Sequence, residues 1–176
     1  MPGDIANIPH QLNDDGECRV VVETTKASRS KYVHSPELGA FELRKLLPEG
    51  MSFPLDFGFV PSTRAEDGDP LDVLVLHDEP IVMGAVVTVR LIGVIEAEQT
   101  EDGKTERNDR LVAVCIHSQL YRAFGRLEDL GGDFIDHLKQ FFVNFNRLEG
   151  KSFDVLRLGD RAGAIEAVRR TSIPPG

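Results

Sequence analysis

Short runs of valine, isoleucine and leucine, separated by turn-forming residues, fill the first two thirds of this chain. Runs of this length bounded by Gly, Pro, Asp or Ser are typical of β-strands. The interval 48–68, rich in Pro, Gly and Phe, is predicted to be mostly an ordered loop, and the charged interval 96–108 a hairpin loop. Strands are predicted at residues 19–25, 31–34, 40–47, 72–76, 86–95 and 110–116.

The last third has a different pattern. From Phe134 to Phe145 the apolar side chains follow helical spacing on one face, and Gly150 stands where a helix C-cap belongs. A short strand is predicted at 152–158, and Asp160 is placed to cap a second helix that ends near Arg170. Strands followed by helices predict an α+β, mainly β fold, in which helices pack against a small barrel.

The chain has 176 residues, a length that suits one domain with peripheral tails at 1–15 and 172–176. The N-terminus lacks the basic and apolar regions of a secretory signal, and the most apolar stretch, 81–97, is too short and too interrupted to span a bilayer. The two cysteines are no disulfide framework and are expected to be buried thiols. We therefore expect a cytoplasmic protein without a membrane partner.

The formal net charge is −9. Binding to a phosphate backbone needs a basic face, so this charge argues against a nucleic-acid partner, including the single-strand binding that small barrels support. An acidic protein that handles an anionic small molecule needs cations, and an excess of carboxylates is what bound metal ions require.

The segment DGDPLD places three carboxylates within six residues, at Asp67, Asp69 and Asp72. Like charges this close repel one another, so a cation stabilises the arrangement, and oxygen donors suit Mg²⁺ or Ca²⁺. An EF-hand is excluded, because glycine and glutamate are missing from that motif's sixth and twelfth positions. The segment alone leaves a solvated acidic turn as the alternative.

The segments FGFVP and DGDPLDVLV resemble the signature of the family I soluble inorganic pyrophosphatases. The resemblance extends over most of the chain, from about residue 19 to about residue 151. The landmarks follow the family's order, at Glu23, Lys31, FGFVP (57–61), DGDPLDVLV (67–75), RLVAV (110–114) and LEGK (148–151).

This resemblance implies a five-stranded OB-like barrel with flanking C-terminal helices, several Mg²⁺ ions, with Mn²⁺ as an alternative, and hydrolysis of pyrophosphate to two phosphates. It also implies a homo-oligomer, with a hexamer favoured. By the same resemblance, Asp67 and Asp72 would hold a metal ion, Asp69 would accept a proton from the attacking water, Glu23 would lie at the metal and substrate site, and Lys31 would hold phosphate.

Several positions differ from the family's pattern. A phosphate-binding arginine is expected where Lys45 aligns, with Arg44 adjacent, and an acidic position in the charged hairpin is Asn108. A second glutamate, three tyrosines and a lysine of the family are replaced by Val33, Phe53, Phe57, Phe145 and Asn146.

The charged hairpin offers other carboxylates. Asp102 and Asp109 are the predicted metal ligands there, and Arg110 matches the basic residue that follows the hairpin in the family. The replaced cations could be supplied by Arg44, Lys45, Arg64, Arg107, Arg122 or Arg147.

The replaced positions keep two alternatives open. One is a hydrolase of another small phosphorylated compound on the same fold. The other is a weakly active or inactive regulatory homologue.

Overall fold

Five strands close into a ring in this computed structural model, which describes residues 4–176. The ring runs β1–β4–β5–β8–β6 and returns to β1; all neighbours are antiparallel except β5 and β8. The predicted mainly β fold, a five-stranded barrel with C-terminal helices, is therefore confirmed. The elements are η1 (Ile5–Asn7), β1 (Glu17–Thr24), β2 (Ser30–Ser35), β3 (Ala40–Leu46), β4 (Asp56–Val60), β5 (Leu71–Leu76), β6 (Val86–Glu101), β7 (Lys104–Arg107), β8 (Arg110–Cys115), η2 (Leu127–Leu130), α1 (Gly132–Leu148), β9 (Ser152–Gly159) and α2 (Arg161–Thr171).

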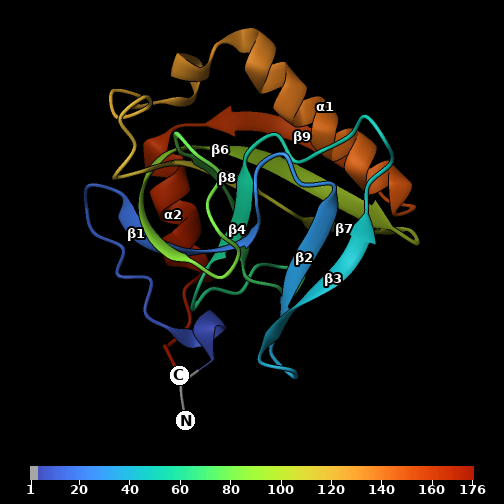
Figure 1. The fold of residues 1–176 in the computed structure, drawn as a ribbon, viewed down its shortest axis with the longest axis horizontal. Helices are drawn as coiled ribbons and strands as arrows, with labels where there is room; N and C mark the ends of the chain where they lie inside the picture. Colours follow the sequence, from blue (N-terminus) through green and yellow to red (C-terminus); the bar gives the residue numbers. More distant parts are fainter. Residues whose placement is uncertain (1–3) are drawn as a thin grey trace.

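Three further parts surround the ring (Figure 1). Strand β6 is long enough to leave the barrel, and its far half pairs with β7 on one side and β9 on the other. Helix α1 lies across β9, at the top of the view, and the separate hairpin β2–β3 stands beside the barrel. This arrangement leaves the end of α1 close to the hairpin.

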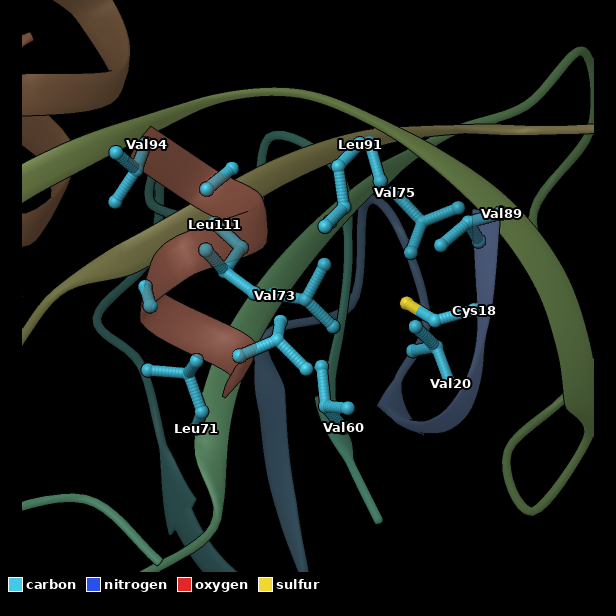
Figure 2. Packing of buried hydrophobic residues seen from close by; sticks show 14 of the residues in the cluster. Cys18, Val20, Val60, Leu71, Val73, Val75, Val89, Leu91, Val94 and Leu111 are labelled. Atoms are coloured by element: carbon cyan, nitrogen blue, oxygen red, sulfur yellow. The ribbon is translucent and has the colours of Figure 1, made fainter. Parts of the chain in front are cut away.

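Two apolar clusters explain why several strands have no polar face. In β5, Val73 and Val75 point into the barrel interior, where α2 also packs, whereas Leu74 and Leu76 point to the opposite face, covered by α1. Figure 2 shows the interior cluster, in which Val73 and its neighbours from several strands converge around α2. A strand buried on both faces has a continuous apolar run, as residues 73–76 of β5 do.

Segment 48–68 is mostly loop, as predicted, but it also contains β4, a strand that is buried throughout and was not predicted. The reason lies at Gly58, opposite Val22 on β1. A Cβ at Gly58 would lie 2.0 Å from the carbonyl oxygen of Val21. Glycine is present because two backbones approach closely, and such a glycine has the same appearance in the sequence as one in a turn.

The charged interval 96–108 was predicted to be a hairpin loop, but most of it is strand. Strand β6 continues to Glu101, β7 starts at Lys104, and only two residues join them. Asp102 and Gly103 have φ values of 50° and 77°. Positive φ at both central residues is the requirement of a tight two-residue hairpin turn, and Asp-Gly meets it well.

The helix ends agree with the sequence. Helix α1 ends before Gly150, whose φ is 75°, and the Asp160 side chain accepts a 2.9 Å hydrogen bond from the Gly163 amide at the start of α2. Cys18 and Cys115 are buried free thiols, as predicted. In residues 4–176, no helix has the length and apolar character needed to cross a membrane.

The two ends of the described chain are held by backbone hydrogen bonds. The Gly176 amide donates to the Asn7 carbonyl, and the Ile173 amide donates to the carbonyl of Ser62. The Ser62 amide in turn donates to Ala6, which lies at the cavity described next. The N-terminal segment therefore forms part of the wall of that cavity.

Candidate active site

A cavity of about 300 Å³ opens where the barrel, the β2–β3 hairpin and the end of α1 meet. Carboxylates from β1, β5 and the 67–70 loop line one side, and lysines from β2 and the α1–β9 connection line the other. The floor is aromatic, from Phe57 on β4 and Phe142 and Phe145 on α1.

The acidic side is built largely by the loop before β5. Gly68 has a φ of 90°, which lets the chain turn between two aspartates, and the Asp67 carboxylate accepts a 3.0 Å hydrogen bond from the Asp69 amide. Asp69 itself is exposed, whereas Asp72 is half-buried at the start of β5. Glu23, at the end of β1, completes the group and accepts a 2.8 Å hydrogen bond from the His34 amide.

Burial and the charges of neighbouring carboxylates disfavour ionisation of Glu23, Asp67 and Asp72 in the absence of a cation. Desolvation raises the pKa of Glu23 to about 8, against a lowering by the His34 amide, and the charges of Asp72 and Asp69 raise it further. Desolvation likewise raises the pKa of Asp67 to about 6, with Asp69 and Asp72 adding to the rise. The pKa of Asp72 is raised by burial and lowered by Arg110 and Lys31. Such a group favours a bound cation.

The donor set fits a hard divalent ion in its chemistry, since all four groups offer carboxylate oxygens. Their present orientations do not enclose one: within residues 4–176, no three Asp, Glu, His or Cys side chains come together in metal-holding geometry. Asp72 is instead turned toward Arg110, with Nη1 to Oδ2 at 2.7 Å. Binding a cation here requires that side chains rotate.

Arg110, the first residue of β8, is the central cation of the cavity. Its side chain is almost fully buried, and its guanidinium lies over the rings of Phe142 and Phe153, at 5.0 and 5.4 Å from the centroids. It also hydrogen-bonds the Asn108 side chain, while its Nε has no partner. A planar cation held in this way is oriented before any ligand arrives.

Three lysines form the basic side. Lys31 and Lys45 are neighbours across the β2–β3 hairpin, and their ammonium groups lie 4.7 and 5.5 Å from the centroid of the Phe145 ring. Lys151, just after α1, completes the trio, and all three surround the Glu149 carboxylate at 3.9 to 4.0 Å.

The structure brings most of the predicted site residues together. Asp69, the predicted base, lines the cavity with Glu23, Lys31, Asp67, Asp72 and Arg110. Lys45 reaches its edge through Glu149. Arg44 does not join them: it is the extra residue where the β2–β3 register shifts, and its exposed side chain pairs with Glu42 at 2.9 Å.

Asp102 and Asp109, the predicted hairpin ligands, also lie outside the cavity. Asp102 is exposed because it occupies the turn between β6 and β7. Asp109 is buried on the opposite face of its segment from Asn108 and Arg110, where it accepts from the Ala97 amide and pairs with Arg107 at 3.0 Å.

Three cavity residues, Gln99, Glu149 and Lys151, had no predicted role, and Asn108 was noted only as the replacement of an acidic residue. Asn108 and Gln99 face the acidic group as an amide pair, with the Asn108 Nδ2 donating to the Gln99 Oε1 at 2.6 Å. Glu149 and Lys151 lie opposite. The segment LEGK was recognised as part of the resemblance, but no local pattern indicated that its charged side chains reach the β2–β3 hairpin.

Comparison with known proteins gives a consistent result. A family model described as "Inorganic pyrophosphatase" matches residues 20–173. The inorganic pyrophosphatase of Thermus thermophilus is 36% identical over 153 residues, which cover 85% of each chain. The soluble inorganic pyrophosphatase of Zea mays is 34% identical over 150 residues, 85% of this chain and 68% of that protein.

Solved structures agree with the sequence relatives. The structure of the Thermus thermophilus inorganic pyrophosphatase matches with a TM-score of 0.87 at 31% identity, over 96% of this chain and 97% of that one. That of the Neisseria gonorrhoeae inorganic pyrophosphatase matches with a TM-score of 0.86 at 29% identity, over 96% of both chains. With its fold, the order of its motifs and nearly its whole length in agreement, this chain belongs to the inorganic pyrophosphatase family, a family of hydrolases.

Proposed function

We propose that this protein hydrolyses inorganic pyrophosphate to two phosphates with the help of Mg²⁺, for which Mn²⁺ could substitute. The observation that carries the proposal is a single cavity that places four carboxylates opposite a set of lysines, in a chain of the inorganic pyrophosphatase family. Carboxylates suit hard cations, and lysines suit the phosphoryl oxygens of a highly charged anion.

Asp67 and Asp72 are the proposed metal ligands, with Glu23 contributing from β1. Their raised pKa values support this assignment, since a group of carboxylates that resists joint ionisation gains most from a cation. A bound Mg²⁺ supplies neutralisation of phosphoryl charge and increases the acidity of a water molecule. The Asp72 Oδ2 is paired with Arg110, so ligation through that oxygen would break the ion pair, whereas Oδ1 is not part of it.

Asp69 is the proposed general base. Its carboxylate is exposed at the cavity, and its own amide donates to Asp67, which fixes the loop without occupying the Asp69 side chain. Held this way, the Asp69 oxygens can accept the proton of the attacking water. The carboxylate then returns the proton to solvent when the two phosphates leave.

The cations orient the substrate and stabilise the leaving phosphate. Arg110 offers a fixed planar guanidinium, held by Asn108 and by the aromatic rings beneath it. Lys31 and Lys45 offer point charges from the hairpin. Donors placed before the reaction stabilise charge that develops in the transition state without reorganisation at that moment.

The amide pair favours a second candidate function. Asn108 and Gln99 contribute oxygens to the cavity wall without charge, and Phe53 and Phe145 contribute rings without a hydroxyl. Fewer charged contacts favour a smaller or less highly charged phosphorylated compound, or slow turnover. This candidate predicts faster hydrolysis of another phosphate ester or anhydride than of pyrophosphate.

The test is release of phosphate from pyrophosphate by the purified full chain, with Mg²⁺, with Mn²⁺ and with EDTA. Asp69→Asn is the matched variant, because it keeps the size of the side chain and removes the base. Metal-dependent release that disappears in Asp69→Asn supports the proposal. Folded protein that hydrolyses another compound from a panel of phosphate esters, and not pyrophosphate, contradicts it.

We also propose a homo-oligomer located in the cytoplasm, on the family resemblance. Multi-angle light scattering of the purified chain and fractionation of its host cells test these two points. A monomer, or recovery outside the cytoplasm, contradicts them.

A further inference from the structure

The Glu149 carboxylate lies at the centre of the basic side of the cavity. It comes from the residue that follows α1, and its side chain is 24% exposed. Its Oε1 is 3.9 Å from the ammonium nitrogen of Lys31 and 4.0 Å from that of Lys45, and its Oε2 is 3.9 Å from that of Lys151. One carboxylate is therefore the shared counter-ion of three lysines that come from two separate parts of the chain.

None of these three contacts is a direct charge-assisted hydrogen bond, which would bring N and O to about 2.7–2.9 Å. Glu149 neutralises the lysines without using their N–H donors fully. The face of the Phe145 ring attracts the ammonium groups of Lys31 and Lys45 but offers them no oxygen. Lys151 has a further ion pair, with Glu101 at 3.5 Å. The donors of Lys31 and Lys45 are thus available to an anion with more oxygens.

The position of Glu149 also makes its carboxylate easy to displace. The C-terminal end of a helix carries partial negative charge, so a carboxylate there is unfavourable unless cations offset it. Gly150 follows with a φ of 75° and ends the helix. The side chain is consequently held by the lysines more than by its own segment.

We propose that Glu149 is a specificity-determining residue that occupies the anion position of Lys31, Lys45 and Lys151 in the free protein and must be displaced by the substrate. This inference rests on the proposed phosphate-binding role of the lysines. An anion of one charge gains little by replacing a carboxylate. A multiply charged phosphoanhydride or phosphate dianion presents several oxygens and gains contacts with all three lysines. Glu149 therefore selects for highly charged phosphoryl groups.

Calorimetric titration of inorganic phosphate into the full chain in EDTA tests the proposal without any requirement for hydrolysis. Glu149→Gln removes the competing charge, and we expect it to bind phosphate more tightly by about fivefold or more. Glu149→Asp keeps the charge and is expected to stay near the wild type. Asp136→Asn is the charge-matched control: Asp136 lies on α1, the helix that Glu149 follows, its side chain is 75% exposed, and among the described residues its ion pair is with Lys139, at 3.5 Å, so the change should alter affinity less than about twofold.

The outcomes separate this inference from the proposed function. Unchanged or weaker phosphate binding by folded Glu149→Gln overturns the inference and shows that Glu149 holds the lysines in place. Tighter binding by Asp136→Asn as well reduces the effect to net charge and also overturns it. A wild type that binds phosphate in this way but does not hydrolyse pyrophosphate contradicts the proposed function only. With turnover present, Glu149→Gln is expected to lower the KM for pyrophosphate.

Discussion

Arg110 and Asp72 are partners in two senses: they lie opposite each other in the register of the parallel strands β8 and β5, and their side chains form a 2.7 Å ion pair in the candidate active site. The parallel register brings the two residues together although they are far apart in the sequence. In the free protein this pair neutralises a carboxylate that we propose as a metal ligand.

Arg110→Ala is expected to destabilise the protein by about 2 kcal/mol, because it leaves Asp72 without its counter-ion and uncovers the rings of Phe142 and Phe153. Urea denaturation at neutral pH measures the change. Arg157→Ala is the control, since Arg157 pairs with Glu96 on the exposed face of β9 and β6 and its loss should leave stability nearly unchanged. Equal effects of the two variants would contradict the central role of Arg110.

The raised pKa of Glu23 predicts a pH dependence of folding in EDTA. The ordinary pKa of 4.5 rises to about 8 in the folded protein, so between these values the folded state binds a proton that the unfolded state lacks. Stability contributed by this group is therefore present below about pH 4.5 and is lost as the pH rises toward 8. Glu23→Gln should flatten the decline in unfolding free energy over this range. A decline of the same slope in the variant would refute the assignment.

Gly58→Ala is expected to cost more than about 2 kcal/mol, because its Cβ would lie 2.0 Å from the Val21 carbonyl oxygen and force β4 away from β1. Gly132→Ala is the matched control. Gly132 begins α1 with no atom near its would-be Cβ, so alanine there should be neutral or stabilise by up to about 1 kcal/mol. Thermal denaturation of both variants, followed by circular dichroism, makes the comparison.

Asp67 and Asp102 each precede a glycine, but their replacement by asparagine should affect turnover differently. Asp102→Asn keeps an Asn-Gly turn between β6 and β7 and should leave turnover of pyrophosphate unchanged. Asp67→Asn removes a proposed ligand from the cavity and should lower turnover by at least about tenfold at limiting Mg²⁺. Initial rates over a Mg²⁺ titration measure both. A strong loss in Asp102→Asn would mean that the hairpin bends toward the cavity in the working enzyme.

The local pattern of the chain predicted most of the fold because its signals act over short distances. The apolar runs of β1 and β6, the helical stripe of α1, Asp160 as a cap and the closely spaced Asp67, Asp69 and Asp72 each depend on neighbouring residues. Strand β4 was missed because the glycine at position 58 is required by the close approach of the β1 backbone, which is distant in the sequence. The β6–β7 hairpin was called a loop because its charged side chains resemble those of loops.

The sequence was less informative about which residues line the cavity. Asp109 lies between Asn108 and Arg110 in the sequence, but alternation of side chains places it on the other face, and only the pairing of β8 with β5 establishes which face meets the acidic loop. Glu149 reaches Lys31 and Lys45 because the fold brings the end of α1 to the β2–β3 hairpin. Spacing along the chain thus identified the carboxylates that lie within one segment. Contacts between distant segments became known only from the folded barrel, because they depend on strand register and on the docking of helices.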